Sequence, residues 1–129
     1  NLNNIITLLD SPSDIKRKIN RAVTDSGKEI KYSKNRPGLS NLIDIYSILN
    51  NQSIKEIEDK YRGKMYSVLK YDLIEIINEY LNPIQNEYSR IIKDDNYLNQ
   101  ILENGAEKCS WKARRTLSKV YKKVGFIKK

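Results

Sequence analysis

The hydrophobic positions of this chain recur at helical spacing along most of its length. The first helix is expected after Ser11 and Pro12, because serine caps the free N–H groups of a helix start and proline suits the first helical position. Its apolar residues recur three or four positions apart: Ile15, Ile19, Ala22 and Val23. We predict that Gly27 ends this helix in a left-handed conformation and opens a polar loop.

A second helix is predicted over about residues 40–49. Hydrophobic residues lie on most of its sides, which is typical of a central, buried helix. Pro37 fixes φ ahead of it and Gly38 permits a tight entry, so we expect Ser40 or Asn41 to cap its first turn.

Further helices follow the same logic. Ser53 with Glu56 three residues later predicts a capping box and a short helix to about Lys60. Apolar residues at helical spacing predict the remaining helices, over about residues 66–81, 97–102 and 106–124. Pro83 is expected either to kink the helix over 66–81 or to start a new helix, because proline has no N–H to donate. The chain is therefore predicted to be an all-α bundle of about six helices with short connections.

The distribution of charge along the sequence bears on the kind of partner that the chain binds. Of the 129 residues 31% are charged, and the formal net charge is +8. Residues 1–36 carry eight Lys/Arg against four Asp/Glu, residues 37–104 seven against eleven, and residues 105–129 nine against one. The positive charge is therefore placed at the two ends of the sequence, which favours an anionic partner on one face. A merely solubilising surface explains the composition equally well.

Residue usage excludes several chemistries. Cys109 is the only cysteine and histidine is absent, so an intrachain disulfide, a cysteine zinc site and a histidine base are excluded. The carboxylate pairs Asp94–Asp95 and Glu58–Asp59 diverge on a helix, so neither is expected to form an acid/base or metal site. No apolar run reaches the roughly 20 residues that span a membrane, and a cytoplasmic location is expected.

Four short blocks carry a family resemblance. They occupy residues 22–27 (AVTDSG), 36–42 (RPGLSNL), 82–88 (NPIQNEY) and 105–108 (GAEK). In order and spacing they resemble the C-terminal part of the bacterial-type tryptophanyl-tRNA synthetases, a class I family, and the similarity runs from about Ile5 to Phe126. The resemblance implies that residues 1–10 follow the KMSKS loop of such an enzyme, and that residues 11–129 form its helical anticodon-binding domain.

The resemblance also implies an activity for the full-length enzyme, a homodimer that activates tryptophan with ATP and Mg²⁺ and charges tRNA(Trp). The missing N-terminal catalytic domain would carry that chemistry, so we expect no catalytic residue, cofactor or metal in this chain. The HIGH signature cannot occur without histidine. Gly63–Ser67 imitates KMSKS but lacks the second lysine at the required place, and we interpret it as a helix-entry loop.

The resemblance assigns the RNA contacts. In related synthetases the segment around Asp25 reaches the anticodon, where Asp25, Lys28 and Glu29 offer groups for the edges of unstacked bases. A lysine matching Lys70 contacts the anticodon stem-loop. Phosphate contacts are expected from five basic residues, of which Lys64 and Arg90 are chosen mainly on charge: Lys16, Arg17, Lys18, Lys64 and Arg90.

Other readings remain open. A general RNA-binding module would bind without anticodon preference, and a helical interaction domain would bind a protein through an apolar groove. The last helix is basic and amphipathic, which also suits a membrane surface or a calmodulin-like groove. DNA binding is not expected, because the second helix of the pair over 40–49 and 53–60 is net acidic and would repel phosphates.

Overall fold

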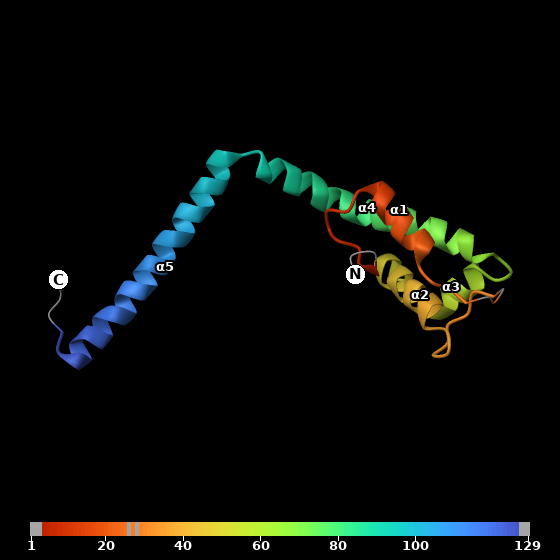
Figure 1. The fold of residues 1–129 in the computed structure, drawn as a ribbon, viewed down its shortest axis with the longest axis horizontal. Coiled ribbons are helices and arrows are strands. Elements are labelled where there is room, and N and C mark those ends of the chain that lie inside the picture. The colour runs from red at the N-terminus through yellow and green to blue at the C-terminus, as the bar shows by residue number, and fades with distance from the viewer. Residues whose placement is uncertain (1–3, 26, 28, 127–129) are drawn as a thin grey trace. The chain divides into compact units, whose positions relative to one another are not determined.

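The computed structural model describes residues 4–25, 27 and 29–126, and the described chain is built from helices and their connections (Figure 1). The helices are, in order, α1 (Pro12–Arg21), α2 (Pro37–Asn50), α3 (Ile54–Lys60), α4 (Tyr66–Ile92) and α5 (Asp95–Val124). The predicted all-α class is confirmed, with five helices over these residues in place of about six. The chain divides into two compact units, Asn1–Asn86 and Glu87–Lys129, called here the N-terminal and C-terminal units.

The start of α1 is as predicted, and its end is not. The backbone N–H of Asp14 donates to Ser11 Oγ at 3.1 Å, which confirms the cap. The helix ends at Arg21, and Ala22 is its C-cap. Gly27 lies instead in the loop that joins α1 to α2, residues 22–36, called here the α1–α2 loop.

The expected cap of α2 is wrong. The helix begins at Pro37, so Ser40 and Asn41 lie inside it. Ser40 is buried, and its hydroxyl donates to the Ser33 carbonyl at 2.8 Å and accepts from the Ser33 N–H at 3.0 Å. This serine therefore fastens the α1–α2 loop to α2 instead of capping the helix.

The capping box of α3 is confirmed in both directions. The Glu56 N–H donates to Ser53 Oγ at 3.3 Å, and the Ser53 N–H donates to Glu56 Oε2 at 2.7 Å. Local sequence alone determines this start, because every partner lies within three residues.

The two long helices pass through residues that were expected to interrupt them. Helix α4 continues through Pro83, where a kink or a new helix was predicted, and α5 is one helix where separate helices over 97–102 and 106–124 were predicted. A glycine costs a helix only about 1 kcal/mol relative to alanine. Pro83 lies between Leu81, which is buried, and Gln85, which bonds to the segment before α1. These contacts support the helix on both sides of the missing N–H.

The hydrophobic core lies in the N-terminal unit, where α1, α2, α3 and α4 bury their apolar faces. Tyr46 and Tyr61 meet edge to face at its centre, with ring centroids 5.6 Å apart. Two residues placed on buried faces by the pattern are exposed instead, Val23 at 83% and Ile48 at 79%. In the C-terminal unit no residue of α5 is buried.

Candidate nucleic-acid interface

Asp25 lies at the centre of a polar cluster in the α1–α2 loop. Arg36 holds its carboxylate in a two-point contact, with Nε and Nη2 each 2.7 Å from a different oxygen. The Tyr66 hydroxyl donates to it at 2.8 Å and the Gly27 N–H at 2.6 Å. The Arg36 hydrogen bonds are the largest cause that keeps the pKa of the Asp25 carboxyl well below its usual range.

Glu29 belongs to the same cluster through its backbone. Its carbonyl accepts from Arg36 Nη1 at 3.0 Å and lies 3.3 Å from the Tyr66 hydroxyl. The residue is exposed, and no hydrogen bond or ion pair of its carboxylate is found among the described residues. Lys28, which sequence placed beside it as a base contact, lies outside the described residues.

Lys70 is tied to the end of α1. Its ammonium group donates to the carbonyls of Ala22 at 2.8 Å and Asn20 at 3.2 Å. The side chain is half-buried, and burial lowers the pKa of the lysine. From α4, Lys70 thus stabilises the free carbonyls at the C-terminal end of α1. Because Tyr66 precedes it by one turn on α4, the structure brings Asp25, Glu29 and Lys70 to one end of the N-terminal unit.

The predicted phosphate-contact residues do not form one group. On α1, Lys16 is exposed and Arg17 pairs with Asp14 at 2.9 Å. Lys64 lies in the turn before α4, with its ammonium 5.3 Å from the centre of the Tyr61 ring. Arg90 belongs to the C-terminal unit, where it makes a two-point contact with Glu87 at 2.7 and 2.9 Å. Their role in phosphate binding stays a prediction.

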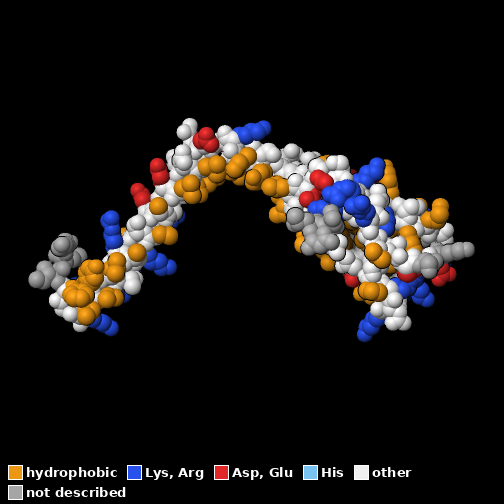
Figure 2. Space-filling view, viewed as in Figure 1, with side chains coloured by type: hydrophobic (Ala, Val, Ile, Leu, Met, Phe, Trp, Pro, Cys, Tyr) orange, Lys and Arg blue, Asp and Glu red, His pale blue; other side chains and the backbone are white. Residues whose placement is uncertain are grey.

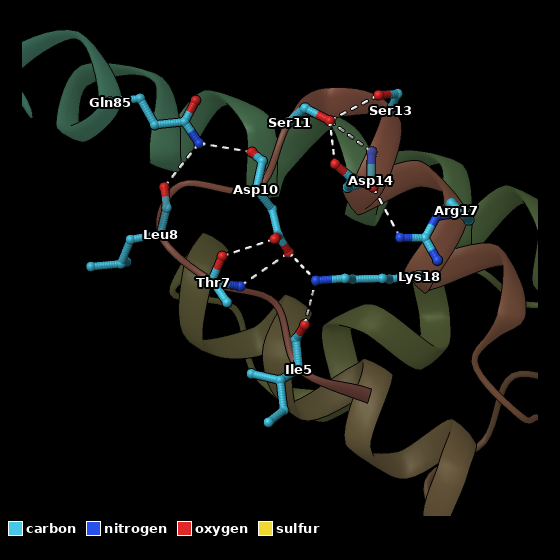
Figure 3. Close-up of polar contacts among 10 residues, drawn as sticks. All are labelled: Ile5, Thr7, Leu8, Asp10, Ser11, Ser13, Asp14, Arg17, Lys18 and Gln85. Carbon is cyan, nitrogen blue, oxygen red and sulfur yellow. Dashed lines mark hydrogen bonds and ion pairs between the residues drawn. The ribbon is translucent and has the colours of Figure 1, made fainter. Parts of the chain in front are cut away.

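Lys18, the remaining member of that set, points into the segment before α1 (Figure 3). Its ammonium lies 2.5 Å from Asp10 Oδ2 and 2.8 Å from the Ile5 carbonyl, and only 8% of its side chain is exposed. Asp10 also accepts from the Thr7 N–H at 3.1 Å and hydroxyl at 2.8 Å. The Lys18 hydrogen bond is the main cause that lowers the pKa of Asp10 to about 2.

Gln85 of α4 fastens the same segment from the other side. Its side-chain amide donates to the carbonyls of Leu8 at 2.9 Å and Asp10 at 3.0 Å (Figure 3). The segment from Ile5 to Ser11 is therefore held between α1 and α4, and sequence reasoning found no signal for it. We call residues 5–11 the anchor segment.

A basic stripe runs along α5. Its members are spaced four, three, four and three residues apart, which places them on one face of a helix: Lys108, Lys112, Arg115, Lys119 and Lys122. All are exposed, and no Asp or Glu of the described residues pairs with them. The stripe extends over roughly 21 Å at 1.5 Å per residue. Arg115 lies over the exposed ring of Trp111, 5.5 Å from its centre.

The opposite face of α5 is apolar. Figure 2 shows hydrophobic side chains gathered along one side of this helix. Its members also recur at helical spacing: Leu102, Ala106, Cys109, Ala113, Leu117, Val120 and Val124. The helix is therefore amphipathic, with one face suited to phosphates and the other to an apolar surface.

A groove of about 700 Å³ opens on the N-terminal unit between α1, α2 and α4. Its walls are mostly aliphatic, with Ile19, Leu42 and Ile45 among them. In the part of the chain that the structure describes, no three His, Cys, Asp or Glu residues gather into a group able to hold a metal ion. Among the same residues, none of the helices is both long and apolar enough to cross a membrane.

Comparison with known proteins defines the class. The family model of the class I tRNA synthetases (W and Y) matches residues 1–82, and the chain belongs to this family. Within it, the chain is similar to the tryptophan–tRNA ligase of Clostridium acetobutylicum, with 46% identity over 127 residues. The match covers 98% of this chain and 38% of that relative. The corresponding ligase of Bacillus subtilis is 45% identical over 125 residues, which are 96% of this chain and 38% of that relative.

Solved structures agree. The tryptophanyl-tRNA synthetase of Mycoplasma pneumoniae matches with a TM-score of 0.71 and 27% identity, over 98% of this chain and 39% of that one. The synthetase of Campylobacter jejuni matches with a TM-score of 0.77 and 27% identity, over 95% and 39%. The chain thus spans about two fifths of the length of the relatives it matches, and the resemblance to tryptophanyl-tRNA synthetases is confirmed.

Proposed function

We propose that this chain is the tRNA-recognising C-terminal part of a tryptophan–tRNA ligase, and that it binds the anticodon end of tRNA(Trp). The observation that carries the proposal is the exposed, polar α1–α2 loop, held in a defined place beside Lys70 in a chain of this family. The role is positional: holding the tRNA by its anticodon raises the effective concentration of its acceptor end at a distant active site.

The proposal divides the contacts by chemistry. Glu29, whose carboxylate is exposed, and Lys28 supply groups for base edges, and Lys70 keeps a third N–H beyond the two it gives to α1. Lys16, Lys64 and the basic stripe of α5 attract the phosphate backbone. Base contacts then set the choice of tRNA, and phosphate contacts set the affinity and its dependence on salt.

The rest of the activity belongs to the part of a longer protein that resembles the remaining three fifths of the relatives. That part would activate tryptophan with ATP and Mg²⁺, esterify it to the tRNA and form a cytoplasmic homodimer. The chain itself would then form no adenylate. An ATP–pyrophosphate exchange assay of this chain with tryptophan, compared with the full-length protein, tests that division: exchange by the chain alone contradicts it.

A salt titration tests the phosphate contacts. The affinity for tRNA(Trp) is measured between about 50 and 250 mM salt for the wild type, for K112Q/K119Q and for K55Q, a control on the net acidic helix α3. Each lost phosphate contact lowers the slope of log K against log salt by about 0.7 to 0.9. We expect a loss of about 1.5 for the double variant and none for K55Q. Equal slopes for all three proteins would exclude the basic stripe from the interface.

A further inference from the structure

The cluster of Asp25, Arg36 and Tyr66 uses its polar groups internally. Both oxygens of Asp25 are occupied, and Nε, Nη1 and Nη2 of Arg36 all donate within the cluster, Nη2 to the Tyr66 hydroxyl as well as to Asp25. The charges of the aspartate and the arginine compensate each other. A base edge that took the place of Arg36 at the Asp25 carboxylate would have to break a two-point, charge-assisted contact.

We propose that Asp25, Arg36 and Tyr66 are positioning residues, a clamp that sets the conformation of the α1–α2 loop for RNA and does not itself contact a base. The inference rests on the proposed function for its RNA part. The clamp joins the loop to Tyr66, the first residue of α4. Tyr66 packs against the hydrophobic core, so the clamp fixes the position of the loop relative to the core of the N-terminal unit. A loop ordered before binding does not lose that conformational freedom when RNA arrives.

Gly27 supplies an independent observation for the clamp. A Cβ built on Gly27 would lie 2.6 Å from Asp25 Oδ1 and 2.8 Å from the Tyr66 hydroxyl, closer than real Cβ contacts come. An alanine methyl group at this position would have to displace these side-chain atoms of the clamp. The glycine is therefore explained by the close approach of the clamp atoms.

Two substitutions separate positioning from contact. Tyr66→Phe removes one hydroxyl and keeps the ring and every charge of the loop. Gly27→Ala adds a methyl group and removes no functional group. Tyr80→Phe is the matched control, because Tyr80 is an exposed tyrosine of α4 whose hydroxyl makes no hydrogen bond to the described residues. Asp25→Asn tests directly whether the carboxylate reads a base.

The experiment combines amide hydrogen exchange of the protein with titration of tRNA(Trp) and of the same tRNA with a changed anticodon. We expect Y66F and G27A to raise the exchange rate of loop amides, that of residue 27 included, at least tenfold. They should reduce the preference for the correct anticodon three- to tenfold with an unchanged salt slope. D25N should behave like Y66F, and Y80F like the wild type.

The outcomes distinguish the clamp from the proposed function. Wild-type exchange rates in Y66F and G27A would overturn the clamp. Faster exchange with an unchanged anticodon preference would overturn its role in RNA binding. A lost preference in D25N with an intact one in Y66F would make Asp25 a base contact and overturn the inference. Failure of the wild type to prefer the correct anticodon would refute the proposed function, while faster exchange in Y66F would still support the clamp.

Discussion

The attachment of the anchor segment to α4 gives a prediction that can be worked from the structure. Gln85 uses both N–H groups of its side-chain amide, one on the Leu8 carbonyl at 2.9 Å and one on the Asp10 carbonyl at 3.0 Å. Gln85→Glu keeps the shape of the side chain, removes both donors, and turns a carboxylate oxygen toward two carbonyl oxygens.

The expected loss follows from the number of bonds. Two neutral hydrogen bonds contribute about 1 kcal/mol each, so Gln85→Met, which has no donor, should lose about 2 kcal/mol. Q85E should lose at least as much, and the half-exposed site limits the extra repulsion by letting the carboxylate turn toward water. The nearest control is Asn86→Asp, because Asn86 is exposed and its side chain bonds, among the described residues, only to Asn82. It should change stability by less than about 0.5 kcal/mol.

Urea unfolding measures the effect. The helical signal in circular dichroism follows both units, and the fluorescence of Trp111, the single tryptophan, reports the C-terminal unit only. With a slope of about 2 kcal/mol per molar urea, the cooperative transition of the N-terminal unit, which contains the hydrophobic core, should fall by about 1 M in Q85M and Q85E. The Trp111 transition should stay in place. A Q85E protein within 0.5 kcal/mol of the wild type, or with Trp111 shifted equally, would refute this reasoning.

Three further predictions concern the N-terminal unit. Leu73→Ala should lower the free energy of unfolding by about 2 to 5 kcal/mol in urea titration, because Leu73 is fully buried. Gly38→Ala should lower the melting temperature, since a Cβ there would overlap the Val23 carbonyl, a backbone atom that cannot turn away; an unchanged melting temperature would contradict that packing. Asp10 is more acidic when folded, so its contribution to stability is present above its unfolded pKa of 3.8 and lost as the pH falls to about 2. Acid titration followed by circular dichroism should therefore show a flatter profile for D10N than for the wild type over this range.

The elements that sequence predicted well are those with local causes. The cap at Ser11 and the capping box of Ser53 with Glu56 depend on partners three residues away, and both are present. A kink or a new helix was predicted at Pro83, and two separate helices were predicted over 97–102 and 106–124, but α4 and α5 are each one helix across these positions. Tertiary contacts on α4 and the length of α5 outweighed a local cost that sequence reasoning treated as decisive.

The polar cluster shows why the site was only partly predictable. The family resemblance singled out Asp25 and Lys70, and the structure places both at one end of the N-terminal unit. Their partners lie far along the chain: Arg36 is eleven residues from Asp25, Tyr66 is 41 away, and the Ala22 carbonyl is 48 residues from Lys70. No periodicity or spacing rule links residues at such separations, so the internal use of these side chains appears only in the folded chain.

The central claim is tested most directly by a binding titration of this chain with tRNA(Trp) and with the same tRNA carrying a changed anticodon. At about 0.15 M salt, attraction between exposed charges is screened beyond roughly 8 Å. The account predicts tighter binding of the correct anticodon, and a smaller difference when Glu29 is changed to Gln. Equal binding of the two RNAs, or binding of neither, would contradict anticodon recognition by this chain.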